Sequence, residues 1–167
     1  MNRFYTFGCA VVVIGQLTQT ASVVAEETPA PTTAAETVSL FFHALAKGDI
    51  DRAVAFTAPL MGVPDEAVRY KYAELSEFAK AAAPQVIGHL QLGDAAVVIF
   101  HEGGPNKTTI DPAFLVRRDN KWLVVFKLTR HDRPYHQFDE TTQARLKKLG
   151  DWFDSQKPQL QRMIGGA

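Results

Sequence analysis

Apolar residues gather between residues 86 and 128 in short segments that turn residues separate. Residues 86–92 and 95–101 flank Gly93-Asp94, and a leading glycine suits the two-residue type II′ turn of a β-hairpin. Because such a turn fixes the register, it also fixes which side chains share a face of the sheet. The pairs predicted for one face are Leu92/Ala95, Leu90/Val97 and Gly88/Ile99, and those for the other are Gln91/Ala96, His89/Val98 and Ile87/Phe100.

A second hairpin is predicted from residues 113–118 and 121–126, with Asp119-Asn120 between them. Apart from glycine, Asp and Asn best tolerate positive φ. Its predicted pairs are Val116/Leu123 and Phe114/Val125 on one face, and Leu115/Val124 and Ala113/Phe126 on the other. Residues 102–107 are expected to form the loop between the hairpins. Both faces are apolar in the middle, whereas a half-solvated antiparallel sheet alternates apolar and polar residues, so each face needs a cover.

Three helices are predicted before the sheet. Thr33 and Glu36 form a capping box at the start of the first helix, which ends before Gly48. A short second helix is predicted over residues 50–56, and a third over residues 64–83. The apolar stripes are Val38, Phe41, Phe42 and Leu45 in the first helix and Val68, Tyr72, Leu75, Ala79 and Ala82 in the third, with Phe78 at the edge. These amphipathic helices are expected to cover one face of the sheet.

Helical spacing returns after the polar segment at residues 129–137. The apolar residues there are Leu146, Leu149, Trp152 or Phe153, Leu160 and Met163, and Pro158 predicts a kink or a break into two helices. This C-terminal helix is expected to cover the second sheet face, unless a second subunit does so. The pattern as a whole predicts an α+β fold, in which N-terminal helices pack on a curved antiparallel sheet of about four strands and a C-terminal amphipathic helix is added.

Residues 1–25 have the three parts of a secretory signal peptide: a positive charge, an apolar run over residues 4–15 and a polar stretch that ends in Ala25. The apolar run is too short to span a bilayer, which needs about 20 residues. Cleavage after Ala25 would leave residues 26–32 as a flexible lead and would remove Cys9, the one cysteine. The expected mature protein is periplasmic or secreted. It would have no stable membrane span and no thiol for disulfides, catalysis or metal binding.

The length of 167 residues suits one domain with its own core. The 18 basic and 18 acidic side chains cancel, so no global field favours nucleic acid as a partner. We place the domain at residues 33–128 and a C-terminal helical extension at residues 129–167.

Three phrases resemble the nuclear transport factor 2-like superfamily, which has a cystatin-like cone fold. They are Ala-Lys-Gly-Asp-Ile-Asp-Arg-Ala at residues 46–53, Gly-Asp-Ala-Ala-Val at residues 93–97, and Phe-Leu-Val-Arg-Arg-Asp-Asn-Lys-Trp-Leu-Val at residues 114–124. The last two resemble strands of exported members of unknown function. The resemblance covers residues 33–128 and implies a curved sheet and helices that enclose a pocket. Members range from steroid isomerases and dehydratases to adaptors without chemistry, and the added C-terminal segment here puts the usual sheet-to-sheet dimer in doubt.

Candidate chemistry depends on single residues, because the sequence has no phosphate-binding glycine loop, no G-x-S-x-G elbow and no H-E-x-x-H helix. The acid–base candidates are His89, His101, Glu102 and Asp111. As strand neighbours, His101 and Glu102 must face opposite ways. The predicted register puts His89 and Glu102 on one face, with Phe100 between them. The residues expected to line a ligand pocket are Tyr72, His89, Phe100 and Glu102.

For two groups of charged residues, we prefer a structural interpretation to a functional one. His131, Asp132 and His136 fit no common metal-ligand spacing, so no metal and no cofactor are expected. A basic set could bind an anionic envelope polymer or a lipid surface. Lys and Arg also prevent the edge strands of a sheet from pairing with another chain, and we prefer this structural interpretation. The basic set is Arg117, Arg118, Lys121, Lys127, Arg130 and Arg133.

These patterns predict an exported, non-catalytic module that binds a small apolar ligand or an envelope protein partner. One alternative is a small isomerase- or dehydratase-like enzyme with His89 or Glu102 as general base, and another is a structural homodimer. The enzyme needs two titratable groups that converge in a closed apolar cavity. The binding module needs the cavity without the pair. The dimer needs an exposed apolar sheet face.

Overall fold

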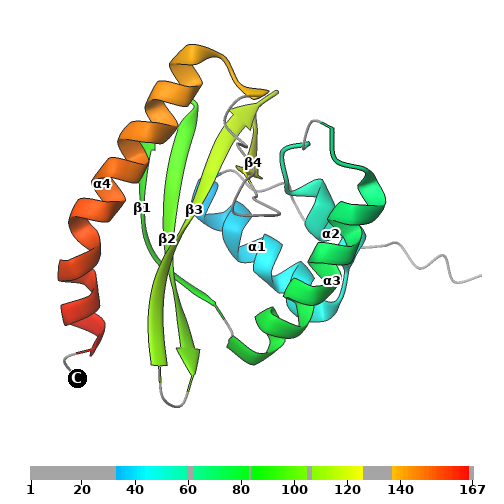
Figure 1. The fold of residues 1–167 in the computed structure, drawn as a ribbon, viewed down its shortest axis with the longest axis horizontal. Coiled ribbons are helices and arrows are strands. Elements are labelled where there is room, and N and C mark those ends of the chain that lie inside the picture. Colours follow the sequence, from blue (N-terminus) through cyan, green and yellow to red (C-terminus); the bar gives the residue numbers. More distant parts are fainter. Residues whose placement is uncertain (1–32, 60–61, 83, 105–106, 126–136, 166–167) are drawn as a thin grey trace, which may run out of the picture.

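A four-stranded antiparallel sheet lies between two layers of helix (Figure 1). The computed structural model describes residues 33–59, 62–82, 84–104, 107–125 and 137–165. The elements in chain order are α1 (Ala34–Lys47), α2 (Ile50–Ala55), α3 (Asp65–Ala82), β1 (Gln85–Leu92), β2 (Ala95–Gly104), β3 (Lys107–Arg118), β4 (Lys121–Val125) and α4 (Glu140–Gly165). The predicted α+β fold is therefore confirmed. The predicted signal peptide and flexible lead lie outside the described residues.

Helix α1 begins and ends where the sequence predicts. The Thr33 hydroxyl accepts a hydrogen bond from the Glu36 backbone N–H at 3.2 Å, and the Glu36 carboxylate accepts one from the Thr33 N–H at 3.1 Å. This reciprocal capping box satisfies two of the donors that a helix start leaves free. At the other end Gly48 adopts φ 73°, the left-handed conformation that closes a helix at least cost with glycine.

The strands pair in the order β1-β2-β3-β4, and each neighbouring pair is antiparallel. Gly93 has φ 62°, and Asp119 and Asn120 have φ 48° and 60°, so both predicted turns form with the positive φ angles that they need. The turns set the register over most of each hairpin. The confirmed pairs are Leu92/Ala95, Gln91/Ala96, Leu90/Val97, His89/Val98, Gly88/Ile99, Val116/Leu123, Leu115/Val124 and Phe114/Val125.

The predicted register is wrong at the start of β1. Phe100 pairs with Val86, not with Ile87, because the register shifts between Val86 and Gly88. Such a β-bulge adds one residue to a strand and leaves it unpaired. Ile87 is consequently 40% exposed, although it is a large apolar residue. The fourth predicted pair of the second hairpin, Ala113/Phe126, involves a residue outside the described chain.

The loop predicted at residues 102–107 is also wrong in extent. Strands β2 and β3 continue through this region and pair over ten residues, from Ala95/Val116 to Gly104/Lys107. Pro112 is compatible with this longer β3, because it lies where β3 has no β4 partner among the described residues and its missing N–H interrupts no described β3–β4 pair. The two long central strands carry the candidate site.

Helices α1, α2 and α3 cover the first face of the sheet (Figure 1). The predicted apolar stripes form the core with residues of the strands, among them Trp122, which is 3% exposed. The buried members are Ala34, Val38, Phe41, Ala44, Leu45, Ala53, Val68, Tyr72, Ala79, Ala96, Val98, Leu115, Trp122 and Val124. Burial of each large side chain in such a core stabilises the fold by about 1.5–3 kcal/mol.

Among the described helices, α4 covers the second face, as the sequence predicts. Its residues Leu146, Leu149 and Phe153 are buried against the strands, and Phe138 is buried just before the helix. Two details differ from the prediction. Pro158 lies inside one helix, so the predicted break into two helices does not occur, and Met163 is 70% exposed instead of packed. Beyond Pro158, Leu160 and Ile164 pack beside a small cluster around Phe153.

The Gly93-Asp94 turn is joined to the start of α4. The Arg145 guanidinium forms an ion pair with the Asp94 carboxylate, and the Thr142 hydroxyl lies 3.3 Å from the other Asp94 oxygen. The Asp139 carboxylate accepts the Thr142 backbone N–H at 2.9 Å, as an N-cap does. These contacts place the first turns of α4 over the end of the β1–β2 hairpin.

Replacement of Gly93 by alanine tests this junction. The left-handed φ of 62° is strained for alanine, and the new Cβ would lie 2.9 Å from Arg145 Cζ. We expect Gly93→Ala to lower the free energy of unfolding by about 1–2 kcal/mol in urea titrations. A Cβ at Gly103 would meet nothing within 4 Å, so Gly103→Ala should change stability by less than about 0.5 kcal/mol. Equal stabilities of the two variants would contradict the expectation.

Candidate functional site

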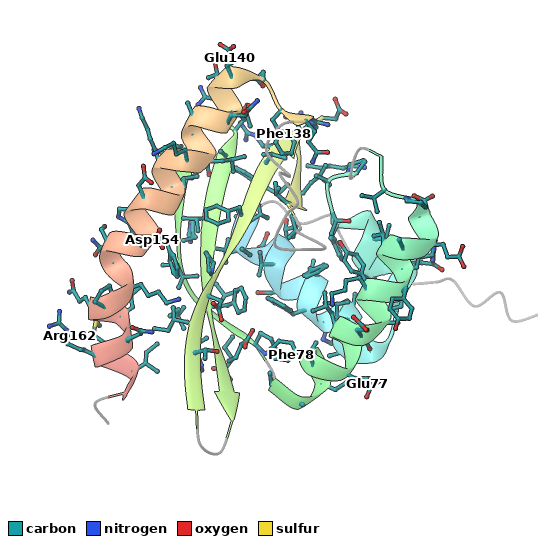
Figure 2. The ribbon with its side chains drawn as sticks, viewed as in Figure 1. Glu77, Phe78, Phe138, Glu140, Asp154 and Arg162 are labelled. Carbon is teal, nitrogen blue, oxygen red and sulfur yellow. The ribbon has the colours of Figure 1, made fainter. Side chains whose placement is uncertain are left out.

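A cavity of about 370 Å³ lies between the helices and the first face of the sheet. Small-molecule sites commonly enclose roughly 300–1,000 Å³. In Figure 2, Phe78 lies on the side of α3 toward the strands, and Glu77 lies on the other side. The lining residues are Phe41, Phe42 and Leu45 from α1, Leu75 and Phe78 from α3, Phe100 and Glu102 from β2, Pro112, Ala113 and Phe114 from β3, and Val124 and Val125 from β4.

Aromatic rings form a connected group on one side of the cavity. The ring of Phe42 lies 4.8 Å from that of Phe100, centroid to centroid, at an interplanar angle of 60°. Phe41 lies 5.4 Å from Phe42 and 5.8 Å from Tyr72. These separations fall within the range of favourable aromatic pairs. Phe42 bridges the buried core and the cavity, because it contacts both Phe41 and Phe100.

Glu102 is the titratable residue among the described lining. It lies two residues beyond Phe100 on β2, so both side chains leave the strand on the same face. The Thr109 hydroxyl, directly across on β3, donates a hydrogen bond to Glu102 Oε2 at 3.2 Å. The other carboxylate oxygen has no hydrogen bond to a described residue. Glu102 therefore supplies a free acceptor at the end of an apolar space.

The surroundings of Glu102 favour its neutral form. Partial burial raises the pKa of this carboxyl above its ordinary value, and the negative charge of Asp111 adds to the increase, while the Thr109 hydrogen bond opposes it. Asp111 pairs with Phe100 across the β2–β3 ladder, so it leaves the sheet on the same face as Glu102. A cation bound beside Glu102 would offset the desolvation cost that burial imposes on the ionised carboxylate.

Tyr72 lies in the core and not among the cavity residues. It is 1% exposed, contacts Phe41 edge to face, and shares a hydrogen bond with the Thr57 side chain. Burial raises the pKa of Tyr72 to about 12, although the hydrogen bond with Thr57 opposes the shift. The sequence predicted the correct face of α3 for this residue, but its ring supports the cavity from behind.

His89 shares a face with Glu102, as the register predicts, yet it does not line the cavity. It stands on β1, an edge strand of the sheet, and is exposed. The two candidate bases therefore do not meet in the described cavity. His101 leaves β2 on the opposite face, and its Nε2 lies 3.2 Å from Gln85 Oε1. As predicted, only one of the neighbours His101 and Glu102 joins the site.

The sequence predicted Phe100 and Glu102 among the twelve lining residues and did not predict the other ten. Of these, Phe42, Leu75 and Phe78 widen the apolar stripes of α1 and α3 beyond what the core uses, so they are half-buried or, for Phe78, 42% exposed. An apolar stripe wider than the neighbouring core needs is the signal that could have located the cavity.

The described residues contain no group of three His, Cys, Asp or Glu side chains that could hold a metal ion. They also contain no helix with the length and hydropathy required to cross a bilayer. His131, Asp132 and His136 lie outside the described part of the chain.

Two members of the predicted basic set contact aromatic rings. The guanidinium of Arg117 lies 5.6 Å from the ring centroid of Trp122, and that of Arg118 lies 4.9 Å from Phe138. Such cation–π contacts are worth about 0.5–1 kcal/mol at exposed sites. Lys127, Arg130 and Arg133 fall outside the described residues, so the preferred interpretation of the basic set, protection of a sheet edge, stays a prediction.

Comparison with known proteins adds information on the fold. No protein-family model and no curated protein matches the sequence. Among solved structures, an NTF2-like protein from Campylobacter jejuni is 21% identical with a TM-score of 0.46, and the match covers 57% of this chain and all of that one. At this TM-score the similarity to that NTF2-like protein carries no argument about the family of this chain.

Two further solved structures are similar at lower scores. A SEC-C motif containing protein from Rhodopseudomonas palustris is 18% identical with a TM-score of 0.37, over 50% of this chain and 67% of that one. A protein from Kribbella flavida is 16% identical with a TM-score of 0.39, over 64% of this chain and 93% of that one. At these identities the likeness concerns the fold, so function is argued below from the cavity.

Proposed function

We propose that this chain is an exported module that binds a small apolar ligand in the cavity between α1, α3 and the sheet. The observation that carries the proposal is a lining with four phenylalanines of α1, α3 and β2 and other apolar residues around one carboxyl group. Binding sites for small molecules are mostly apolar, with a few polar groups that orient the ligand. The export part of the proposal is supported by the pattern of residues 1–25.

An enzyme of the isomerase type is the second candidate, because Glu102 is a carboxyl group of raised pKa beside an apolar space. Proton transfer generally needs a second group to polarise the substrate or to return the proton. His89, the predicted partner, is not in the described lining. The geometry therefore supports binding better than turnover.

The structural homodimer and the docking of an envelope protein receive less support. Both would use an apolar face of the sheet or of the C-terminal helix. Among the described residues, helices cover both faces, and the apolar stripe of α4 packs on its own sheet. The cavity thus offers the better-supported binding site.

A cavity-filling variant tests the proposal. Ala113 lines the cavity from β3, and a phenylalanine there suits a strand while it occupies ligand space. The wild-type protein is expected to bind the uncharged dye N-phenylnaphthylamine with a saturable rise in fluorescence. We expect Ala113→Phe to weaken this binding at least about tenfold, which corresponds to about 1.4 kcal/mol.

The matched control is Ala144→Phe, which adds the same side chain to an exposed position of α4 on the far side of the sheet. This variant should bind the dye as the wild type does. Circular dichroism would establish that both variants are folded. Absence of dye binding to the wild type, or equal binding by the two variants, would refute the proposed site.

A further inference from the structure

The carboxyl group of Glu102 is a polar feature in an otherwise apolar lining. None of the described lining residues is basic. Glu102 forms no ion pair with a described residue, since its one hydrogen-bond partner is the neutral hydroxyl of Thr109. A partly buried carboxylate without a cation is costly for the protein, and a ligand can supply the missing charge.

The carboxyl group of Asp111 on the same face carries a charge of the same sign. Asp111 leaves β3 on the face of Glu102 and makes its ionisation less favourable. A second carboxylate makes this end of the cavity attractive to cations and repellent to anions. A ligand with its own carboxylate would therefore meet repulsion in addition to the cost of desolvation.

The aromatic lining is also compatible with a positive charge. Phe42 and Phe100 lie in contact with each other, and Phe100 precedes Glu102 by two residues on the same face of β2. The faces of phenylalanine rings attract cations within about 6 Å, and this attraction grows when water is excluded. The phenylalanine rings and the Glu102 carboxylate together suit a ligand in which an ammonium group is attached to an apolar hydrocarbon part.

We propose that the ligand of this cavity is an amphiphilic amine, whose protonated nitrogen pairs with Glu102 while its apolar part lies among Phe41, Phe42, Phe78 and Phe100. The inference rests on the proposed function, because it concerns the same cavity. Glu102 Oε2 already accepts the Thr109 hydroxyl, so the ammonium group donates to the other carboxylate oxygen, Oε1. The nitrogen replaces part of its hydration by the carboxylate and by ring faces.

Three probes with one apolar body and different head groups test the inference. They are 4-phenylbutylamine, 4-phenylbutanol and 4-phenylbutyrate, each measured by displacement of N-phenylnaphthylamine at neutral pH. The amine is expected to bind at least about tenfold more tightly than the alcohol, and the carboxylate more weakly than the alcohol. High salt should reduce the advantage of the amine, because the preference is electrostatic.

Replacement of the carboxyl group locates the origin of the preference. In Glu102→Gln the ratio of amine to alcohol affinity is expected to fall to about one. Glu77→Gln is the matched control, since Glu77 lies beside Phe78 on α3 but on the side away from the sheet (Figure 2). This control should keep the wild-type ratio.

The outcomes separate the two proposals. If neither the dye nor any of the three probes binds, the proposed function is wrong, and the amine inference with it. If the probes bind but the alcohol or the carboxylate matches the amine, the cavity binds ligands and the amine inference is wrong. An amine preference that persists in Glu102→Gln would also overturn the inference. The comparison of head groups on the wild type needs no variant, so it decides the matter even if Glu102→Gln fails to fold.

Discussion

Leu149→Ala is expected to lower the free energy of unfolding by about 3 kcal/mol, within the range observed for buried leucines. Leu149 is fully buried and lies in the middle of α4, in the cluster that includes Ala95, Val97 and Val116 of the sheet. The substitution removes apolar contact and leaves a cavity between the helix and the strands. Among the described helices, α4 is the one that packs on this face, so we expect little compensation from a neighbouring helix. Urea denaturation followed by circular dichroism measures the effect.

Lys148→Ala provides the comparison in the same helix. Lys148 is exposed and alanine is a good helix former, so we expect a change of less than about 0.5 kcal/mol. Similar losses for the two variants would mean that α4 does not pack on the sheet through Leu149. A small loss for Leu149→Ala alone would mean that this face is stabilised from elsewhere.

The second large effect concerns Tyr72 at alkaline pH. Burial raises the pKa of its phenol to about 12 in the folded protein, against about 10 in an unfolded chain. A raised folded pKa means that the stabilisation is fully present below pH 10 and is lost as the pH rises through 12. The unfolded state releases the proton first, so the wild-type protein should lose about 2–3 kcal/mol of stability from this group across that range.

Tyr72→Phe removes the titrating group and should remove this part of the alkaline loss. At pH 7 the variant is expected to be about 1 kcal/mol less stable than the wild type, because Thr57 loses a hydrogen-bond partner. Between pH 10 and 12 the order should reverse. Tyr70→Phe, at an exposed position of the same helix, should follow the wild type at every pH. Parallel curves for Tyr72→Phe and the wild type would contradict the buried position of this phenol.

The parts of the fold that could be predicted are those fixed by local chemistry. The capping box at Thr33, the glycine at residue 48 and the two-residue turns act within a few residues, and each is found where the sequence places it. The pairing of β2 with β3 near residues 102–112 could not be predicted in the same way. It depends on the match of two long strands, which overrides the local tendency of Gly103 and Pro112 toward a loop.

The candidate site could be predicted only in part. The periodicity of apolar residues predicts on which face of a helix or strand a side chain lies, but it does not predict how deeply that side chain is buried. Phe100 and Glu102 share a face, and both line the cavity. Tyr72 belongs to the apolar stripe of α3 and Phe78 lies at the edge of that stripe, and one is buried while the other is 42% exposed. The distance between the helix and the sheet at each point decides between these outcomes. His89 is on the correct face, but it stands on an edge strand, where that face opens to water.

The position of α4 also determines the order in which the molecule can be completed. Synthesis proceeds from the N-terminus, so the helices of the first face and all four strands emerge before the residues that cover Val97 and Val116. Until residues 137–165 are released from the ribosome, a nascent chain presents an apolar sheet surface to its surroundings. A ribosome-bound form is therefore expected to need a chaperone more than the form in which α4 has packed on the sheet.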